Sequence, residues 1–282
     1  MSTFTINTSD QYPIAVTTYG KNISSNQIIV ISSAIGVPQT FYTKFAIYLA
    51  NKGYLVFTYD YRGIGQSKPD NLSKLKATFS DWAKKDFKAV TEYIEEKYPN
   101  HSKFLIGHSM GGIILGLSDA FQSYEKIVTI GSQFGYIKNF HSKDQLKIRT
   151  FFQLAIPLLT PFYGYFPSKL LGMGEALPKG IAKDWQYIIM NKNSTLSYAD
   201  LHGNYFADIT QPMLVISIDD DYMAPPKTVD LYAELMVKNA EVTRLNIIPS
   251  EYGLENIGHM DFFRAKKKDI LWQIPLDYIQ QG

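Results

Sequence analysis

The hydrophobic and polar positions alternate between two rhythms along most of the chain. Short apolar runs bounded by polar residues predict strands at 3–8, 12–19, 27–32, 54–59, 103–107, 126–131, 212–218 and 242–248. Apolar positions at helical spacing predict helices at 39–52, 79–98, 226–239 and 260–280, and a further helix opens directly after Ser109. This alternation over short connections predicts an α/β fold with a mostly parallel eight-stranded sheet, covered by helices on both faces.

One stretch of the chain departs from this alternation. Residues 135–210 are dense in aromatic residues and prolines, and they suggest helices but no convincing strand. The strand and helix pattern resumes at Gln211. Because a long insertion of this kind is commonly an active-site lid, we predict a helical cap at 135–210 on a core formed by 1–134 and 211–282. The alternative is a set of peripheral helices with no role at the site.

The composition indicates a folded domain and removes several classes of site. Of the 282 residues, 45% are hydrophobic and 19% are charged, which is ample apolar material for a core. The chain has no cysteine, which excludes disulfides, thiolate metal sites and cysteine nucleophiles. With 28 basic and 26 acidic residues, the charge balance gives no electrostatic case for binding nucleic acid.

The chain also carries no pattern typical of export or membrane insertion. Its first ten residues are polar and lack the basic start and apolar stretch of a secretory signal. No segment approaches the length of about 18 apolar residues that a transmembrane helix needs. We therefore expect a cytoplasmic protein without integral membrane association, and the sequence leaves its oligomeric state open.

The strongest chemical motif is Gly107-His-Ser109-Met-Gly111, which matches the pattern G-x-S-x-G. The serine would occupy a tight turn between an apolar strand and an apolar helix, with room made by the flanking glycines. The backbone N–H of Met110, at the start of that helix, would point at a developing oxyanion. We predict that Ser109 is a nucleophile. The alternative is a glycine-rich helix cap with a buried serine.

A serine nucleophile needs a base, and the chain contains five histidines. In this arrangement the order is serine, acid and then a histidine in a loop after the last strand. Only His259, just before the final predicted helix, lies in such a place, so we predict that it is the general base. His108 flanks the serine, but its side chain should turn away at the elbow, and we interpret it as structural.

The acid of a triad should follow the strand at 212–218, where Asp219, Asp220 and Asp221 stand in a row. The usual turn places the acid three residues beyond the strand, which favours Asp221, with Asp219 as the alternative. It would fix the imidazole tautomer and stabilise the imidazolium. The other aspartates of the row, and Asp230 in the next helix, are interpreted as solvated surface residues.

The loop after strand 27–32 should supply a second oxyanion donor. The N–H of Ile35 is the first candidate, with Ala34 next. Arg62 lies in another turn, Asp60-Tyr-Arg62-Gly-Ile-Gly65, and we interpret it as structural rather than as a clamp for a substrate carboxylate. The chain contains neither a phosphate-binding G-x-x-x-x-G-K motif nor a zinc-binding H-E-x-x-H motif, so we expect no cofactor and no metal.

Together these segments resemble the α/β-hydrolase superfamily over nearly the whole chain. More closely, they resemble predicted bacterial serine hydrolases near the serine aminopeptidase and lysophospholipase-like branch. The matching stretches are 36–42, 59–65, 107–112 and 257–260 with Phe262 and Phe263. The resemblance implies a Ser–His–Asp triad, no cofactor and a cap between strands six and seven. The chain departs from that pattern at Ser33-Ala34, where a His-Gly pair is common, and at Ile218, where a glycine is usual.

These observations predict a serine hydrolase that cleaves a carboxylic ester of a small or medium apolar substrate through an acyl-enzyme. One rival is an aminopeptidase or amidase, which would hold a free substrate amine with a carboxylate from the cap such as Glu175 or Asp184. A second rival is a catalytically silent binding protein on the same fold. A third is an acyltransferase that passes the acyl group to an acceptor other than water.

Overall fold

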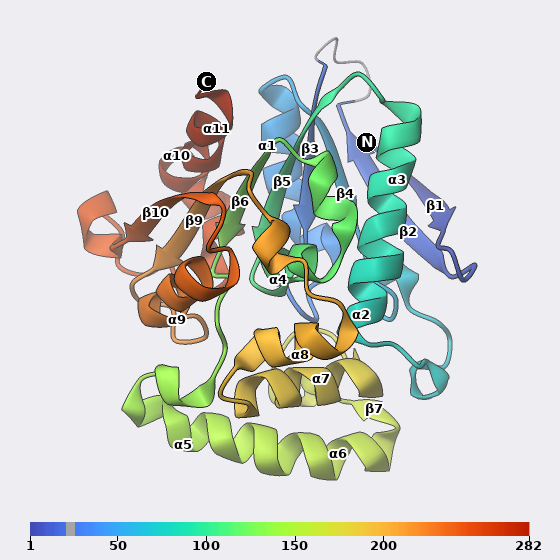
Figure 1. The fold of residues 1–282 in the computed structure, drawn as a ribbon, viewed down its shortest axis with the longest axis vertical. Helices are drawn as coiled ribbons and strands as arrows, with labels where there is room; N and C mark the ends of the chain where they lie inside the picture. The colour runs from blue at the N-terminus through green and yellow to red at the C-terminus, as the bar shows by residue number, and fades with distance from the viewer. Residues whose placement is uncertain (21–25, 282) are drawn as a thin grey trace.

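The computed structural model describes residues 1–20 and 26–281, and eight of its strands form one sheet in the order β1-β2-β4-β3-β5-β6-β9-β10 (Figure 1). The strands are β1 Ser2–Asn7, β2 Pro13–Tyr19, β3 Gln27–Ser32, β4 Leu55–Tyr59, β5 Ser102–His108, β6 Lys126–Ile130, β9 Pro212–Ile218 and β10 Glu241–Ile247. All eight predicted strands are present, with boundaries that differ from the prediction by at most one residue.

The sheet is mostly parallel, as the sequence pattern predicts. Strands β4, β3, β5, β6, β9 and β10 run in the same direction, and β1 and β2 add two antiparallel pairings at one edge. The carboxyl ends of the parallel strands therefore meet at one end of the sheet, where α/β proteins place their ligands.

Helices cover both faces of this sheet. The α-helices of the described residues are α1 Thr43–Asn51, α2 Phe79–Asp81, α3 Lys88–Lys97, α4 Met110–Ile114, α5 Ser142–Thr150, α6 Ile156–Tyr163, α7 Lys179–Met190, α8 Ser194–His202, α9 Pro226–Leu231, α10 Lys268–Leu271 and α11 Gln273–Gln280, of which α5 to α8 lie beyond the end of the sheet. The side chains of β3 show how both faces are used. Ile28 and Val30 join a buried cluster with α3, α4 and α9, whereas Ile29 and Ile31 join a second cluster with α1 and α11. A strand buried on both faces needs the continuous apolar run that this sequence provides.

The segment between β6 and β9, residues 131–211, is called the inserted segment below. It carries α5 to α8 and extends beyond the carboxyl ends of the strands (Figure 1). It also contains a short antiparallel pair, β7 Tyr165–Phe166 with β8 Leu177–Pro178. The expectation of no strand in 135–210 was therefore wrong. Strands of two residues are too short to show an alternating pattern.

Two predicted helices end differently in the structure. The helix expected over 226–239 is α9 followed by a π-helical stretch that stops at Met236. The helix expected over 260–280 consists of short pieces. Its chain is extended at Arg264, and Pro275 lacks the N–H that would bond back to Leu271 near the junction of α10 and α11.

Candidate active site

Ser109 lies at the tight turn between β5 and α4. Its backbone has φ 52° and ψ −116°, a left-handed conformation that costs a residue other than glycine about 1–3 kcal/mol. A Cβ atom on Gly107 would lie 2.6 Å from the backbone of Gly112, and one on Gly111 would lie 2.0 Å from the carbonyl oxygen of Ser32. The two glycines therefore allow the close approach of chain segments that presents Ser109 at the end of the sheet.

His259 lies in the loop after β10, and the structure brings it to Asp221, which follows β9. His259 Nδ1 donates a hydrogen bond of 2.6 Å to Asp221 Oδ2. The other carboxylate oxygen, Oδ1, accepts the backbone N–H groups of Met223 at 2.8 Å and Ala224 at 2.9 Å. With its Nδ1 proton held by Asp221, the ring keeps the lone pair of Nε2 for a proton from elsewhere.

The surroundings of Asp221 favour its ionised form. Burial would raise the pKa of this carboxyl, but the neighbouring His259 and the amides of Ala224 and Met223 outweigh that effect. The pKa of Asp221 consequently lies below its usual value. A buried carboxylate that stays charged at neutral pH can both orient the imidazole and stabilise it when it takes up a proton.

Ser109 and His259 face a common cavity of about 320 Å³, together with Met110 and Ile35. In the described part of the chain no hydrogen bond joins the Ser109 hydroxyl to His259, and such bonds often tighten only when substrate binds. Most of the remaining wall is apolar and comes from the inserted segment. It includes Ile148, Phe140, Phe151, Phe152, Leu171, Met173, Trp185, Ile188 and Ile189.

The row of three aspartates after β9 divides into three environments. Asp221 is buried beside His259, whereas Asp219 is exposed and accepts only a long hydrogen bond from Asn246, at 3.3 Å. Asp220 is exposed as well, but its carboxylate accepts the N–H groups of Ile257 at 2.9 Å and Gly258 at 2.8 Å. Asp220 is therefore solvated, as the sequence analysis expected, but it also holds the loop that carries His259, a role that the sequence analysis did not predict.

A second buried network contacts the backbone of His259. Of its members, the sequence analysis considered only His108. The Nε2 atom of His108 lies 2.9 Å from the carbonyl oxygen of His259, and its Nδ1 lies 2.7 Å from the hydroxyl of Tyr42. Since a carbonyl only accepts, Nε2 carries the proton and the hydroxyl of Tyr42 donates to Nδ1. Burial, with the nearby His259, lowers the pKa of His108 to about 3, which keeps this ring neutral.

Tyr42 also reaches the loop that the sequence analysis assigned to the oxyanion. Its hydroxyl accepts the backbone N–H of Ala34 at 3.0 Å. That N–H is therefore already bonded, whereas Ile35 lines the cavity beside Ser109 and Met110. Tyr42 and His108 therefore connect the Ala34 loop to the His259 loop through two buried, hydrogen-bonded side chains.

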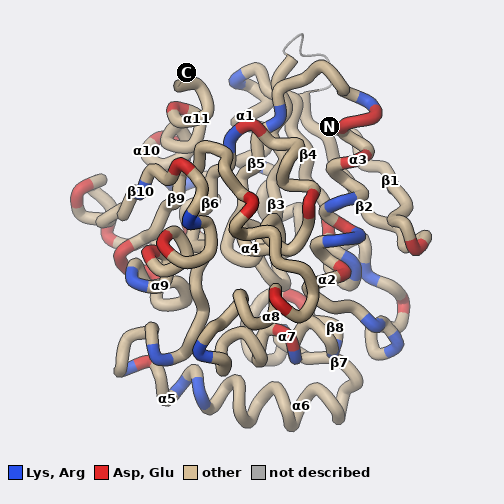
Figure 2. The backbone as a smooth tube through the Cα atoms, viewed as in Figure 1, with Lys and Arg blue, Asp and Glu red and all other residues tan. Residues whose placement is uncertain are grey.

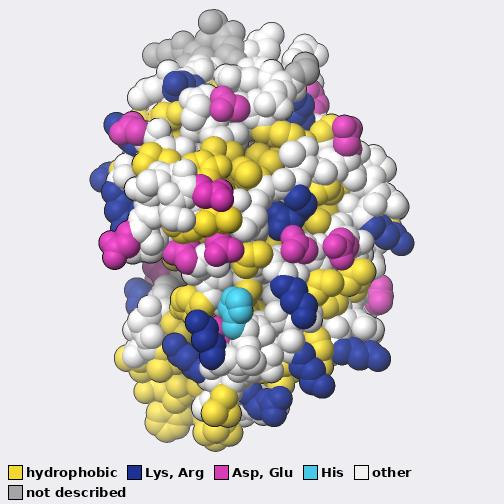
Figure 3. All heavy atoms as spheres, turned by 90° about the vertical axis from the view of Figure 1, so that its left-hand side faces the viewer, with side chains coloured by type: hydrophobic (Ala, Val, Ile, Leu, Met, Phe, Trp, Pro, Cys, Tyr) yellow, Lys and Arg dark blue, Asp and Glu magenta, His cyan; other side chains and the backbone are white. Residues whose placement is uncertain are grey.

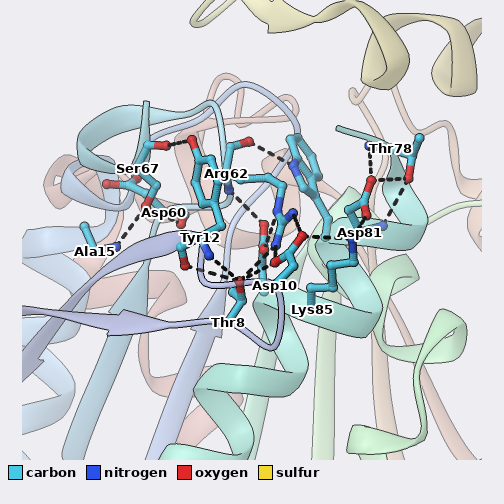
Figure 4. A network of polar contacts seen from close by, with 12 residues as sticks. Thr8, Asp10, Tyr12, Ala15, Asp60, Arg62, Ser67, Thr78, Asp81 and Lys85 are labelled. Carbon is cyan, nitrogen blue, oxygen red and sulfur yellow. Dashed lines mark hydrogen bonds and ion pairs between the residues drawn. The ribbon is translucent and has the colours of Figure 1, made fainter. Parts of the chain in front are cut away.

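Arg62 lies outside the cavity and is buried in a polar network (Figure 4). Its Nε and backbone N–H both bond to the buried carboxylate of Asp86, at 2.7 and 2.8 Å. Its two terminal nitrogens bond to Asp10 at 2.9 and 3.0 Å, and the hydrogen bond from Arg62 holds the pKa of Asp10 well below its usual range. With its donors used in this way, Arg62 ties the β1–β2 turn to the helix after α2, in agreement with the structural interpretation.

The two carboxylates considered as amine ligands are also engaged away from the cavity. Glu175 Oε2 accepts the N–H of Gly65 at 2.9 Å. Asp184 Oδ2 accepts the N–H of Phe79 at 2.9 Å and the hydroxyl of Tyr198 at 2.8 Å. Both side chains therefore attach the inserted segment to the core.

A different carboxylate, that of Asp144 in the first turn of α5, lines the cavity. Its Oδ2 atom is buried and has no hydrogen-bond partner among the described residues. Lys147, one turn later, lines the cavity as well, and its ammonium group lies 5.9 Å from the ring centre of Tyr222. In the sequence, Asp144 looks like any acidic residue near a helix start, so only the fold identifies it.

Two general properties of the described residues bear on the site. Within residues 1–20 and 26–281, no group of three His, Cys, Asp or Glu side chains could hold a metal ion. In the same residues, no helix has the length and apolar character needed to cross a membrane.

Comparison with sequence families gives one match. The family model described as serine aminopeptidase, S33, matches residues 24–188, which is more than half of the chain. No curated protein matches the chain at a significant level.

Solved structures with the same fold include esterases and a protein described as a serine hydrolase. An esterase from Pyrococcus furiosus aligns with a TM-score of 0.64 at 16% identity, covering 98% of this chain and 88% of its own. An esterase from Exiguobacterium antarcticum aligns with a TM-score of 0.61 at 14% identity, covering 99% of this chain and 100% of its own. A Xanthomonas campestris protein, described as an α/β serine hydrolase without lid, aligns with a TM-score of 0.56 at 13% identity, covering 100% and 95%. At these identities the likeness establishes the α/β-hydrolase fold.

Proposed function

The chain belongs to the serine aminopeptidase, S33, family of serine hydrolases with the α/β-hydrolase fold, and we propose that it cleaves carboxylic esters through an acyl-enzyme on Ser109. One observation carries this proposal. Ser109, on a strained turn, faces the same cavity as His259, whose other ring nitrogen is held by the buried Asp221. A serine and a base that share one cavity, with an acid bonded to the base, are the groups that nucleophilic acyl transfer requires.

In the acylation step, His259 Nε2 takes the proton of Ser109 Oγ while Oγ forms a bond to the ester carbonyl carbon. The carbonyl oxygen becomes an oxyanion, which the N–H groups of Met110 and Ile35 stabilise. Asp221 stabilises the imidazolium without taking its proton. The bond from carbon to the alcohol oxygen then breaks, and His259 gives its proton to the departing alcohol.

In the deacylation step, water takes the place of the alcohol. His259 removes a proton from the water while its oxygen bonds to the acyl carbon, and the same two amides hold the second oxyanion. The bond between that carbon and Ser109 Oγ breaks as Oγ takes the proton from His259. The products are the carboxylic acid and the original enzyme.

The side chains that the inserted segment adds to the cavity favour an apolar substrate of small or medium size. It contributes aromatic and aliphatic side chains to a cavity of about 320 Å³, near the lower end of the range of about 300–1,000 Å³ for small-molecule sites. We accordingly assign residues 135–210 the role of a cap over a core of 1–134 and 211–282. The cap would exclude water from the acyl group during the reaction.

The test is labelling with a fluorophosphonate probe, followed by turnover of p-nitrophenyl esters of increasing acyl length. We expect labelling of the wild type and of Ser118→Ala, which alters a buried serine outside the cavity, but not of Ser109→Ala. Labelling that persists in Ser109→Ala would mean that another residue reacts with the probe. Absence of both labelling and ester turnover in the folded wild type would favour a silent binding protein.

A second candidate function is cleavage of an amide or ester next to a free substrate amine. Asp144 favours it, because this cavity carboxylate has a buried oxygen without a hydrogen-bond partner among the described residues. An ammonium group on the substrate would satisfy that oxygen with a charge-assisted hydrogen bond.

Aminoacyl p-nitroanilides and their N-acetyl counterparts separate the two candidates. If Asp144 binds the amine, Asp144→Asn should raise KM for the free-amine substrate at least about tenfold and leave the acetylated one unchanged, since a hydrogen bond to a charged group is worth about 1.5–3 kcal/mol. Equal turnover of both substrates by the wild type, or equal effects of the substitution, would remove the aminopeptidase candidate and leave the esterase proposal in place.

A further inference from the structure

The outermost part of the inserted segment is one helical run from Ser142 to Tyr163, formed by α5, a π-helical stretch and α6. It lies along the edge of the molecule farthest from both chain ends (Figure 1). Four large apolar side chains on it are solvent-exposed: Leu146 at 75%, Leu154 at 55%, Leu158 at 69% and Phe162 at 82%. Their spacing by four and eight residues places them on one side of the helix, called the outer apolar face below.

The opposite side of the same run is already packed. Phe152, Ile156 and Thr160 are buried against the rest of the inserted segment. The outer apolar face is therefore additional apolar surface, which the packing of the segment does not use. An exposed apolar patch of this kind commonly marks a site of interaction with another protein or with a membrane.

Charge is distributed unevenly along this run. Exposed Lys143, Lys147 and Arg149 lie on α5, whereas the sequence between Arg149 and Lys169 contains no charged residue (Figure 2). Figure 3 shows the result on the surface, with hydrophobic side chains gathered at the lower end of the molecule below Lys and Arg side chains. A helix that combines an exposed apolar side with a cluster of basic residues is typical of binding in the plane of an anionic membrane surface.

The wall of the cavity reaches the molecular surface on the same helical run, at Lys147, and at two positions outside it. Lys147, Leu171 and Tyr222 are exposed and also line the cavity. Leu170, next to Leu171, adds a further side chain that is 69% exposed. Lys147 follows Leu146 of the outer apolar face directly in the sequence, so α5 contributes to both the outer apolar face and the cavity wall.

We propose that the outer apolar face docks on the surface of an anionic phospholipid bilayer, with the helical run lying in the interface. The basic residues of α5 complement the charge of the lipid headgroups, and the outer apolar face enters the acyl boundary. The run lies on the membrane rather than across it, because no described helix is suited to span one. Docking is a property of the surface and holds whether or not Ser109 is a catalytic residue.

The test is flotation of the full-length protein with vesicles of phosphatidylcholine mixed with phosphatidylglycerol, compared with vesicles of phosphatidylcholine alone. We expect the wild type to float with the anionic vesicles, and Leu158→Glu/Phe162→Glu to reduce that binding at least about tenfold. Leu201→Glu is the matched control, since Leu201 on α8 has the same 69% exposure as Leu158 and lies outside the face. Lys143→Gln/Arg149→Gln should weaken binding by about fivefold for each charge removed.

Several results would overturn this docking proposal. They are failure of the wild type to bind anionic vesicles, equal binding to the two kinds of vesicle, or undiminished binding by Leu158→Glu/Phe162→Glu with native circular dichroism. A dimer seen by light scattering that the double variant abolishes, without vesicle binding, would assign the face to a second copy of the chain. Ser109→Ala should bind vesicles like the wild type, so a failure of the ester proposal leaves this result unaffected.

Discussion

The core around His259 and the outer side of the inserted segment differ in the environment of their side chains. Around His259, the polar side chains that hold the loop and the ring are paired: the buried Asp221 with the imidazole, the exposed Asp220 with the loop amides, and the buried His108 with Tyr42. On the outer helix, by contrast, large apolar side chains such as Leu158 and Phe162 face solvent. Groups that perform chemistry need one fixed geometry, whereas a surface that meets a variable partner needs only area and charge.

This contrast locates different properties in different parts of the chain. Under the proposed function, reaction geometry depends on hydrogen bonds that the core makes with itself, so small changes there should have large effects on turnover. Under the same proposal, choice of substrate depends on the apolar wall that the inserted segment adds, where a change alters fit by a few contacts. The predictions below test that division, from the largest effect to the smallest.

Asp221→Asn should lower kcat on a p-nitrophenyl ester by a factor on the order of 10⁴, because an amide no longer holds the imidazole in the productive tautomer. Circular dichroism and ester kinetics at neutral pH measure the outcome.

The other members of the aspartate row provide matched controls. Asp219→Asn should leave kcat within about twofold, since this exposed side chain makes only a long hydrogen bond. Asp220→Asn should lower kcat by about tenfold, because one amide oxygen replaces a carboxylate that holds two backbone N–H groups. Equal effects at all three positions would contradict the assignment of the acid to Asp221.

Tyr42→Phe should reduce kcat by roughly 10–100-fold and lower the free energy of unfolding by about 1–3 kcal/mol. The substitution leaves the Ala34 N–H and the His108 ring nitrogen without their buried partner. Tyr124→Phe is the control, because it removes an equally buried hydroxyl that bonds to Thr91 away from the cavity. The prediction fails if the two variants lose stability alike and both keep full kcat.

The buried His108 should make the fold sensitive to mild acid. Its pKa is lowered to about 3 in the folded chain, so between pH 6.5 and 3 the unfolded chain binds a proton that the folded chain does not. His108 therefore contributes a loss of stability as the pH drops through this range, by about 1.4 kcal/mol for each pH unit.

Urea unfolding of the wild type and of His108→Gln at pH 7 and pH 5 isolates this contribution. Burial raises the pKa of Asp86 to about 7, so this carboxyl titrates in the same window with the opposite effect on stability in both proteins, whereas carboxyl groups with lowered pKa values, such as Asp221, titrate below it. His108→Gln should lose stability overall, and its stability should fall less than that of the wild type between pH 7 and pH 5. A pH dependence identical to that of the wild type would mean that His108 is not the group responsible.

The fold was largely predictable because its signal is local. Each central strand is apolar on both faces, so a run such as 27–32 is recognisable without knowledge of its neighbours. The brief strands β7 and β8 were not predictable, since two residues carry no period. The end of the helix at Met236 was missed by three residues, because helix boundaries are poorly defined by the apolar pattern alone.

The candidate site was predictable where chain order and spacing define a role. The pairing of Asp221 with His259 follows from the distance of the acid from the end of β9 and from the place of the histidine after the last strand. The sequence analysis missed Tyr42, Asp144 and the role of Asp220. Tyr42 and Asp220 form hydrogen bonds that only the fold reveals, and Asp144 is distinguished only by the cavity that it lines. No local pattern distinguishes such residues from ordinary surface or core positions.

The smallest expected effect concerns the wall that the inserted segment contributes. Ile148 on α5 lines the cavity, whereas Leu146 on the same helix points outward. Ile148→Trp should fill part of the cavity and lower kcat/KM for the longest accepted p-nitrophenyl ester by about fivefold to tenfold, while turnover of the acetate ester stays within about twofold.

Leu146→Trp is the control for helix position and residue size, and it should leave the whole chain-length profile unchanged in assays without lipid. If Ile148→Trp also left that profile unchanged, the acyl group would bind elsewhere and the inserted segment would not select it. If both esters were slowed equally, the substitution would have disturbed the geometry around His259 instead. Only a loss confined to long acyl chains supports the division between a core that fixes the reaction and a segment that selects its substrate.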